Sequence, residues 1–375
     1  MSQSDYTLVL PAFTIGANAY DAIGQVTKPF GKKVVIIGGK TALSKAEKPL
    51  LDAIKNTDLE VLGVLWYGDD ATYERVDALM AEDAVKNADL IFGVGGGRAI
   101  DTCKVVADKV GKPYFAFPTV ASNCAPSTAI AVMYNEDKSF AGYYYLPTPP
   151  VHTFINMDII ADSPFDLFWA GIGDAMSKEC ESELASRAAD IFHTVLLGRA
   201  LGKVCTEPLL EYGEKALADF KEKKVTYELQ QVVLDIIIST GLVSNCTTGH
   251  NGVYYYNSSI AHLFYNSSTV LPQVVEGHLH GEIVSFGVLV LLTYDKQFEL
   301  LSGQVGRFGY QSRRNRRDRR KSAGHYGMEL RAVSADERSL QAGDRRHGRL
   351  WQRIIKLFSR IKRGDSLQES RPFMV

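Results

Sequence analysis

The sequence predicts an α/β fold in which a parallel-sheet domain is followed by an all-helical domain. Three observations support this prediction. Short runs rich in β-branched residues alternate with helix-length segments in residues 1–162, a glycine-rich turn joins one such run to the next helix, and strand patterns fade after residue 163. We place the sheet domain at 1–162 and the helical domain at 163–304, and we expect the active site in the cleft between them.

The predicted strands of the first domain have a continuous apolar character, which is typical of strands buried on both faces. They cover residues 33–39, 61–66, 88–92 and 114–117. The segments 43–55, 72–86 and 99–110 between them have the apolar spacing of helices. This alternation predicts parallel βαβ units with helices on both faces of the sheet. A candidate helix near residues 18–26 precedes these units, and a hairpin (129–134 with 143–146) and a strand near 153–156 follow them.

The glycine-rich turn, residues 95–97, leads directly into Arg98 and the predicted helix. Successive glycines let the backbone approach a ligand closely, and the N–H groups at a helix start favour an anionic group such as pyrophosphate. The turn is not the GxGxxG fingerprint of dinucleotide-binding proteins, and a turn without a ligand is the simpler alternative. Because the carboxyl ends of parallel strands meet at one edge of a sheet, residues 38–39, 68–69 and 118–119 should converge with it.

In the second domain, residues 165–183, 186–201, 207–221, 227–243 and 280–294 are predicted helices. Asp174 lies in an apolar segment, His262 lies among apolar neighbours, and His280 opens a helix. One carboxylate and two imidazoles, with positions left open to water and substrate, make a catalytic site for Zn²⁺ or Fe²⁺. Taken singly, the three residues have simpler explanations as a helix cap, a core histidine and a surface histidine, since their spacings carry no local metal signature.

Composition argues against several protein classes. The 375 residues are 46% hydrophobic, which suffices for a large core. Nothing at the N-terminus resembles a signal peptide, and no uncharged run reaches the roughly 20 residues of a membrane span. The five cysteines are scattered without a CxxC pair, so neither a disulfide framework nor a structural zinc cluster is indicated. We expect a soluble, cytoplasmic protein without membrane contact.

The end of the chain has a different composition. Residues 305–375 hold 16 Arg and 3 Lys against 7 acidic residues, a net charge of +12, whereas the whole chain has −1. One hypothesis is a reading-frame shift near residue 304, which would change amino-acid usage at a single point. The other is a basic appendage that neutralises the phosphates of a nucleic acid, although it lacks a known binding fold.

Several motifs together resemble the glycerol dehydrogenase branch of the iron-containing alcohol dehydrogenase superfamily. The resemblance covers roughly residues 5–300 and rests on Gly-Gly-Gly-Arg-Ala-Ile-Asp-Thr-Cys-Lys (95–104), Pro-Thr-Val-Ala-Ser (118–122), Ala-Gly-Ile-Gly-Asp (170–174), Ala-His (261–262) and His-Gly-Glu (280–282). It implies a Rossmann-like first domain and reversible hydride transfer between NAD or NADP and a small secondary alcohol or polyol. It also implies a homo-oligomer.

The resemblance further implies the site residues. The metal ligands, through which catalysis would run, are Asp174, His262 and His280. Lys178 stands where the iron-binding branch has a fourth, histidine ligand, which favours zinc. The residues implied to contact the cofactor are Gly96, Gly97, Arg98, Asp101, Thr119, Ser122, Thr128, Ile130 and Tyr134.

Two departures from the family pattern bear on specificity. Cys124 replaces an aspartate beside the substrate, so the family's way of holding a polyol hydroxyl is absent and glycerol itself is in doubt. Gly39 and Lys40 follow the first long strand, where an acidic residue would hold the adenosine ribose; a nearby lysine tolerates a 2′-phosphate and makes NADP plausible, although Lys40 is equally explained as a surface residue.

Two alternatives remain at this point. A dehydroquinate synthase-like or glycerol-1-phosphate dehydrogenase-like enzyme would act on a phosphorylated substrate and would need several basic residues in the cleft, which the sequence does not identify. A non-enzymatic protein could bind nucleic acid through residues 305–375, a partner we do not expect. The encoding DNA around codon 304 would distinguish a shifted frame from a true appendage.

Overall fold

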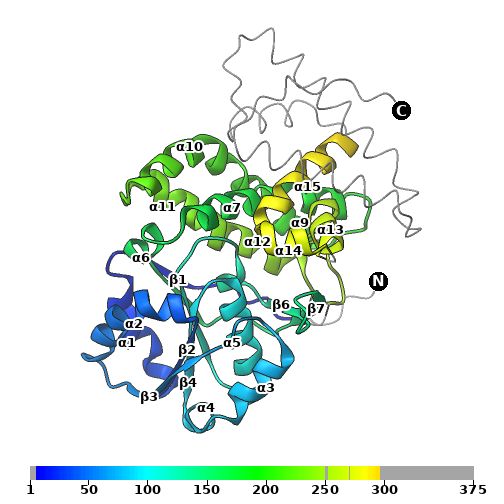
Figure 1. Cartoon of the computed structure of the whole chain (residues 1–375). Helices are drawn as coiled ribbons and strands as arrows, with labels where there is room; N and C mark the ends of the chain where they lie inside the picture. Colours follow the sequence, from blue (N-terminus) through cyan, green and yellow to red (C-terminus); the bar gives the residue numbers. More distant parts are fainter. Residues whose placement is uncertain (1–5, 250–251, 270, 296–375) are drawn as a thin grey trace. The chain divides into compact units, whose positions relative to one another are not determined.

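A computed structural model of the chain describes residues 6–249, 252–269 and 271–295 (Figure 1). The chain divides into two compact units, residues 1–288 and 289–375. In the second unit only residues 289–295, the end of the last described helix, are described. The arginine-rich segment 305–375 lies outside the described residues, so both hypotheses about it stay predictions.

A six-stranded, entirely parallel sheet forms the centre of the first half (Figure 1). Its strands run in the order β1-β8-β5-β4-β2-β3. They are β1 (Phe13–Gly16), β2 (Lys33–Gly38), β3 (Glu60–Trp66), β4 (Leu90–Gly95), β5 (Tyr114–Pro118) and β8 (His152–Asn156). The predicted parallel βαβ arrangement is therefore confirmed. The edge strand β1 was not predicted, because its four residues carry too little periodicity to distinguish them from a loop.

The helices of this half cover both faces of the sheet, as predicted. They are α1 (Ile23–Thr27), α2 (Lys40–Ile54), α3 (Tyr73–Ala81), α4 (Asp83–Asn87), α5 (Gly97–Val110) and α6 (Met157–Ala161). The predicted helix 72–86 is two helices, because Glu82 adopts an extended conformation between them. The predicted hairpin is present as the antiparallel pair β6 (Ile130–Tyr134) and β7 (Phe140–Tyr145).

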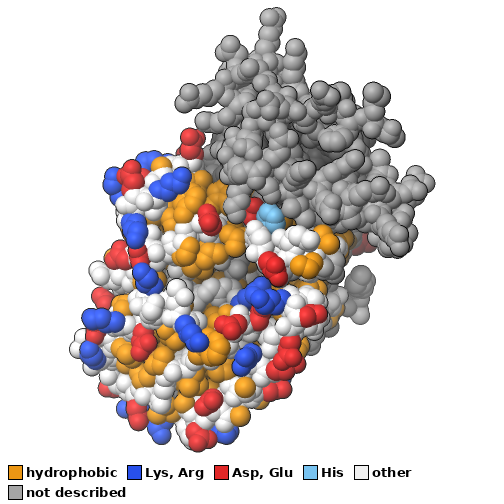
Figure 2. Space-filling view, viewed as in Figure 1, with side chains coloured by type: hydrophobic (Ala, Val, Ile, Leu, Met, Phe, Trp, Pro, Cys, Tyr) orange, Lys and Arg blue, Asp and Glu red, His pale blue; other side chains and the backbone are white. Residues whose placement is uncertain are grey.

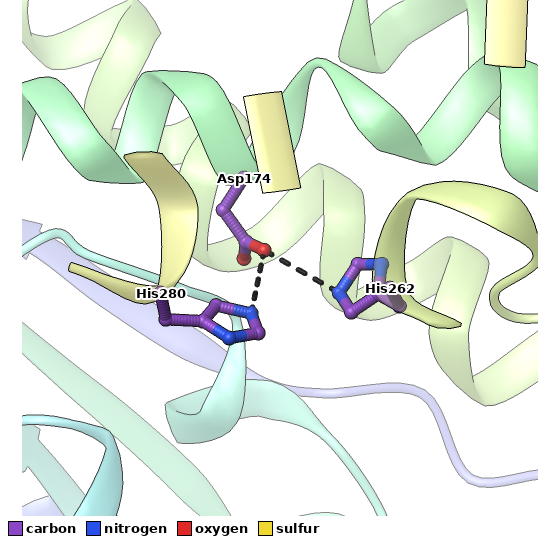
Figure 3. A group of neighbouring side chains, drawn as sticks. All are labelled: Asp174, His262 and His280. Carbon is purple, nitrogen blue, oxygen red and sulfur yellow. Dashed lines mark hydrogen bonds and ion pairs between the residues drawn. The ribbon is translucent and has the colours of Figure 1, made fainter. Parts of the chain in front are cut away.

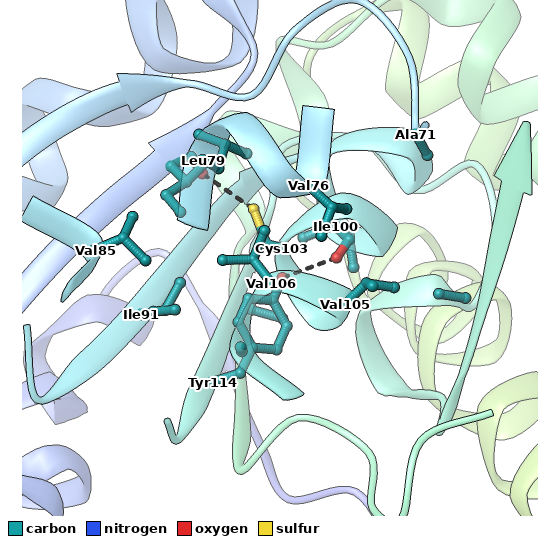
Figure 4. Close-up of a cluster of buried hydrophobic side chains, with 14 of the residues drawn as sticks. Ala71, Val76, Leu79, Val85, Ile91, Ile100, Cys103, Val105, Val106 and Tyr114 are labelled. Atoms are coloured by element: carbon teal, nitrogen blue, oxygen red, sulfur yellow. Dashed lines mark hydrogen bonds between the residues drawn. The ribbon is translucent and has the colours of Figure 1, made fainter. Parts of the chain in front are cut away.

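Side chains of alternate strand residues point to opposite faces of the sheet and pack into two separate hydrophobic cores. Val34 and Ile36 of β2 pack with Leu50 of α2, whereas Val35 and Ile37 face the opposite core. In the core that contains Val35 and Ile37, side chains of α3 and α5 pack against that face of the sheet (Figure 4). The period-two alternation of a strand thus explains why helices are needed on both sides.

The second half of the described chain is helical. It contains α7 (Phe165–Ala175), α8 (Ser177–Ser186), α9 (His193–Leu201), α10 (Glu207–Lys221), α11 (Tyr227–Leu234), α12 (Thr240–Thr247), α13 (Ile260–Ser268), α14 (Pro272–Gly277) and α15 (His280–Tyr294). Two of these, α13 and α14, were not predicted, because they are short and rich in residues with modest helix propensity. The proposed boundary at residue 162 stays a prediction.

One continuous helical stretch of the second half is strongly apolar. Tyr227–Thr247, which includes a π-helical segment at Asp235–Ser239, is 21 residues long and apolar enough to cross a membrane. However, 72% of its most apolar window is buried inside the protein. Such burial is typical of the core helix of a globular fold.

Candidate active site

A cavity of about 1060 Å³ lies at the carboxyl ends of the parallel strands and reaches the helical half. Residues that follow four strands line it, among them Gly39, Gly68, Gly97 and Thr119, so the predicted convergence is observed. Every residue that the sequence analysis nominated for the site lines this one cavity: Gly96, Gly97, Arg98, Asp101, Thr119, Ser122, Cys124, Thr128, Ile130, Tyr134, Asp174, His262 and His280.

The glycine turn connects β4 to α5 in a conformation that few other residues would tolerate. Gly95 has a φ of +153°, and a Cβ there would lie 2.8 Å from the Cβ of Ala99. A Cβ on Gly97 would lie 2.5 Å from Nδ2 of Asn123. The turn therefore keeps its backbone open to the cavity, and the N–H groups at the start of α5 have no partner within the helix.

Arg98 is held by two neighbours. Its guanidinium forms an ion pair with Asp70, with 2.8 Å between Nη1 and Oδ2, and lies 5.0 Å from the centre of the Tyr134 ring. The Arg98 side chain is 41% exposed, so part of the guanidinium still faces solvent and the cavity. An anionic group bound at the glycine turn would therefore lie close to the guanidinium of Arg98, which is already held in position.

Asp101 and Thr128 have structural roles that the sequence did not suggest. Asp101 forms a buried ion pair with Lys104, with 2.9 Å between Oδ1 and Nζ, and accepts a hydrogen bond from the Val132 backbone N–H at 3.1 Å. Lys104 Nζ also donates to Thr128 Oγ1 at 3.1 Å and to the Ile130 carbonyl at 2.6 Å. Burial raises the pKa of Asp101, and Lys104 opposes this rise. These contacts fasten the hairpin to α5; the cofactor contact expected for Asp101 stays a prediction.

Asp174, His262 and His280 come from three different helices and meet at the helical wall of the cavity (Figure 3). Oδ1 of Asp174 lies 3.0 Å from Nε2 of His280 and 3.4 Å from Nε2 of His262. One ligand atom from each residue lies within 4.8 Å of the others. The sequence separated these residues by up to 106 positions, so only the fold could bring them together.

Close helix packing explains why Asp174 and His280 are neighbours. A Cβ on Gly281 would lie 1.9 Å from the Ala170 carbonyl oxygen, and one on Gly171 would lie 2.2 Å from the Ala121 carbonyl oxygen. The start of α15 therefore presses directly against the backbone of α7, which in turn presses against the loop after β5. These glycines set the distance between the carboxylate and the second imidazole.

Glu181 completes the cluster and was missed by the sequence analysis. This fully buried carboxylate lies 2.5 Å from Nδ1 of His262 and accepts hydrogen bonds from the backbone N–H groups of Ser259 (2.7 Å) and His262 (3.0 Å). The contact at Nδ1 directs Nε2 of His262 toward Asp174. The available signal was an acidic residue two helical turns after Asp174, on the same face.

The donor set fits a divalent metal ion. Burial alone would raise the pKa of Asp174, but His280 and His262 hold it well below its usual range. Burial likewise opposes protonation of His262, but Glu181 and Asp174 keep its pKa well above the ordinary value. Two nitrogen ligands and one oxygen ligand thus converge in a strongly negative setting that favours a cation.

Comparisons with known proteins agree with this architecture. Residues 11–153 match the family model described as iron-containing alcohol dehydrogenase. A glycerol dehydrogenase of Escherichia coli O6:H1 is 30% identical over 288 residues, which cover 75% of this chain and 74% of that protein. Hydroxycarboxylate dehydrogenase A of Escherichia coli K12 is 31% identical over 280 residues, 74% of this chain and 75% of that protein.

A solved structure shows the same fold. The crystal structure of a probable glycerol dehydrogenase from Sinorhizobium meliloti 1021 superposes with a TM-score of 0.69 at 25% identity, covering 81% of this chain and 83% of that one.

Proposed function

The chain belongs to the iron-containing alcohol dehydrogenase family, and from this premise we propose that Asp174, His262 and His280 hold the catalytic metal of a dehydrogenase acting on a small alcohol or polyol. One observation carries the proposal. Ligand atoms from three distant segments lie within 4.8 Å of one another at a cavity that also contains the glycine turn. A metal site that can activate an alcohol oxygen and a dinucleotide site that can hold a hydride acceptor, in one cavity, suit metal-assisted alcohol dehydrogenation.

Each part of the chain has a task in the reaction. When bound, the metal supplies a Lewis acid for the alcohol oxygen, and the nicotinamide supplies the hydride acceptor. The glycine turn and Arg98 provide backbone N–H groups and positive charge for the pyrophosphate. Glu181 fixes the orientation of His262. His278, which lines the cavity with Nδ1 3.1 Å from Oε1 of Glu282, is our candidate to accept the proton that the alcohol loses.

We propose zinc as the metal, because three ligands converge among the residues that the structure describes and the position one turn after Asp174 is taken by Lys178. We also propose that NADP is accepted beside NAD. Lys40 follows β2 at the cavity rim, with Nζ 4.0 Å from the centre of the Trp66 ring, and would attract a 2′-phosphate. Lys40→Asp should lower the preference for NADP over NAD by about tenfold, measured as the ratio of the two kcat/KM values.

The direct test is a spectrophotometric assay of nicotinamide reduction. The purified chain, loaded with zinc, is given NAD or NADP and a panel of polyols and simple secondary alcohols. We expect cofactor reduction that chelation abolishes and zinc restores. Stoichiometric metal binding without redox activity toward any alcohol would contradict the proposal.

The alternatives have less support. The homologues favour an alcohol or polyol dehydrogenase over a dehydroquinate synthase-like enzyme. Nucleic-acid binding would depend on residues 305–375, and on the described part of the face in Figure 2 basic and acidic side chains are interspersed. The cytoplasmic location and homo-oligomeric state stay predictions, which cell fractionation and light scattering would test.

A further inference from the structure

The cavity is more basic than the sequence indicated. Six cationic residues line it: Lys40, Lys45, Arg98, Lys138, Lys178 and Lys223. Lys45 and Lys223 both form ion pairs with Asp162, and Arg98 pairs with Asp70. Lys178 differs from these three in its burial, since only 4% of the residue is exposed.

Lys178 has neutral hydrogen-bond partners. Its Nζ donates to Oδ1 of Asn257 at 2.9 Å and lies 3.4 Å from the Asn257 carbonyl oxygen. Among residues 6–249, 252–269 and 271–295, no carboxylate oxygen forms an ion pair with it. An ammonium group carries three donors and a full charge, so a buried lysine bound only to one asparagine is incompletely compensated.

A second buried lysine shows what full compensation looks like in this protein. Lys104, only 1% exposed, forms an ion pair with Asp101 at 2.9 Å and donates to three oxygens of the hairpin. The charge and the donor groups of Lys104 are therefore satisfied within the protein. Lys178 lines the cavity without such a carboxylate, because the nearest buried ones in sequence, Asp174 and Glu181, are engaged by His262 and His280. Its charge is therefore left for an anion that enters the cavity.

The position of Lys178 limits where that anion can lie. Lys178 follows Asp174 by four residues, and the chain stays helical in conformation through Met176 between α7 and α8. Side chains four residues apart on a helix have Cβ atoms about 6 Å apart. An anionic group bound by Lys178 would therefore belong to the same small substrate whose hydroxyl lies at the Asp174 cluster.

The charge of the lining limits which anion fits. Cys124 lines the same cavity with a thiol. One ammonium balances one negative charge, which suits a carboxylate better than a phosphate dianion with its three acceptor oxygens.

We propose that Lys178 binds the carboxylate of a small 2-hydroxy acid, which makes 2-hydroxy acids and their 2-oxo counterparts substrates of this site. This inference rests on the proposed dehydrogenase function. In the reaction the C2–H bond breaks and its electron pair passes as hydride to NAD(P)⁺, the hydroxyl proton is released, and C2 and its oxygen form the carbonyl. The carboxylate itself is unchanged.

The test compares pyruvate with hydroxyacetone, which has the same carbon skeleton with a hydroxymethyl group in place of the carboxylate. Isothermal titration calorimetry of the zinc-loaded full chain measures binding of each compound. We expect Lys178→Met to weaken pyruvate binding by about tenfold or more, as loss of a charged hydrogen bond predicts, and to leave hydroxyacetone binding nearly unchanged. Lys48→Met, at an exposed lysine of α2 whose side chain is 89% exposed, is the matched control.

Three outcomes decide the matter. A selective loss of pyruvate binding, with oxidation of lactate in the NAD(P) assay, supports the inference. The inference is overturned if pyruvate fails to bind the unaltered chain, or if Lys178→Met weakens the binding of both compounds equally. If 1,2-propanediol is nevertheless oxidised, the proposed function stands. Absence of oxidation of lactate, 1,2-propanediol and every other alcohol of the panel by the zinc-loaded chain contradicts the proposed function itself. Circular dichroism of Lys178→Met separates loss of folding from loss of binding, and Lys178→Arg should retain part of the preference for pyruvate.

Discussion

The two walls of the cavity contribute in different ways. The sheet half supplies mainly shape: a glycine turn, strand ends, and the helix α5, whose buried Asp101 is already paired with Lys104. The helical half supplies charges that face one another across separate helices, as Asp174 does with His262 and His280. In the proposed reaction the sheet wall therefore positions the cofactor, and the helical wall holds the groups that bind the metal.

The largest effect is expected at the centre of the helical wall. Asp174→Ala removes the carboxylate that both imidazoles face, and we expect loss of stoichiometric zinc and a decrease of kcat/KM by at least about a thousandfold. Metal analysis and the nicotinamide assay measure the two effects. Asp158→Ala, at an exposed acidic residue of α6, should leave both unchanged. Full activity of Asp174→Ala would show that the charged wall is not the reaction centre.

A smaller effect is expected at the carboxylate behind the cluster. Glu181→Gln keeps the size of the side chain but removes the charge that orients His262, so zinc affinity should fall by about 10- to 100-fold. Competition with a metal-binding dye measures this affinity. Glu179→Gln, a change of the same kind on the same helix, provides the comparison, and an equal response of both variants would argue that general charge rather than orientation matters.

The close glycine contact between α15 and α7, within the helical wall, can be tested by adding a single methyl group. Gly281→Ala places a Cβ 1.9 Å from the Ala170 carbonyl oxygen, so α15 must shift, at a cost of about 1–3 kcal/mol in the free energy of unfolding. Gly277→Ala meets nothing within 4 Å and should be nearly neutral. Urea denaturation of the two variants gives the difference. Equal stabilities would mean that the helices are not in close contact.

The smallest effect is expected at an exposed ionic link. Asp162 pairs with Lys45 of α2 and with Lys223, which follows α10, and hydrogen bonds from these lysines, with Lys223 first, lower the pKa of Asp162 to about 2 from 3.8. A carboxylate whose pKa is lowered by folding contributes stability above its unfolded pKa and loses that contribution as the pH falls through the folded one. Because the group is partly exposed, the contribution is small.

The effect of this link is best seen as a difference between two acid titrations. Thermal unfolding of Asp162→Asn should differ slightly from that of the unaltered chain above pH 3.8, and the difference should vanish as the pH approaches about 2. A difference that persists at the lowest pH would show that Asp162 acts through something other than its charge.

Much of the sheet half could be predicted because its signals are local. The apolar runs of β2, β3, β4 and β5 and the glycine turn each span only a few adjacent residues, so each run by itself indicates its own burial. Predictions failed where a segment was too short to carry a period, as in β1, or where a single residue broke a helix, as Glu82 does between α3 and α4. The role of Glu181 could not be predicted, because its partner lies 81 residues away.

The sequence by itself determined the alternation of strands and helices, the glycine turn and the residue types available for a metal site, because these depend on side-chain chemistry and short-range spacing. Tertiary structure alone decided that Asp174, His262 and His280 share one point in space, that Glu181 stands behind His262, and that Lys104 has a buried carboxylate partner whereas Lys178 has none among the described residues. The physical reason is that the free energy of a buried charge depends on which groups surround it, and those groups come from distant parts of the chain.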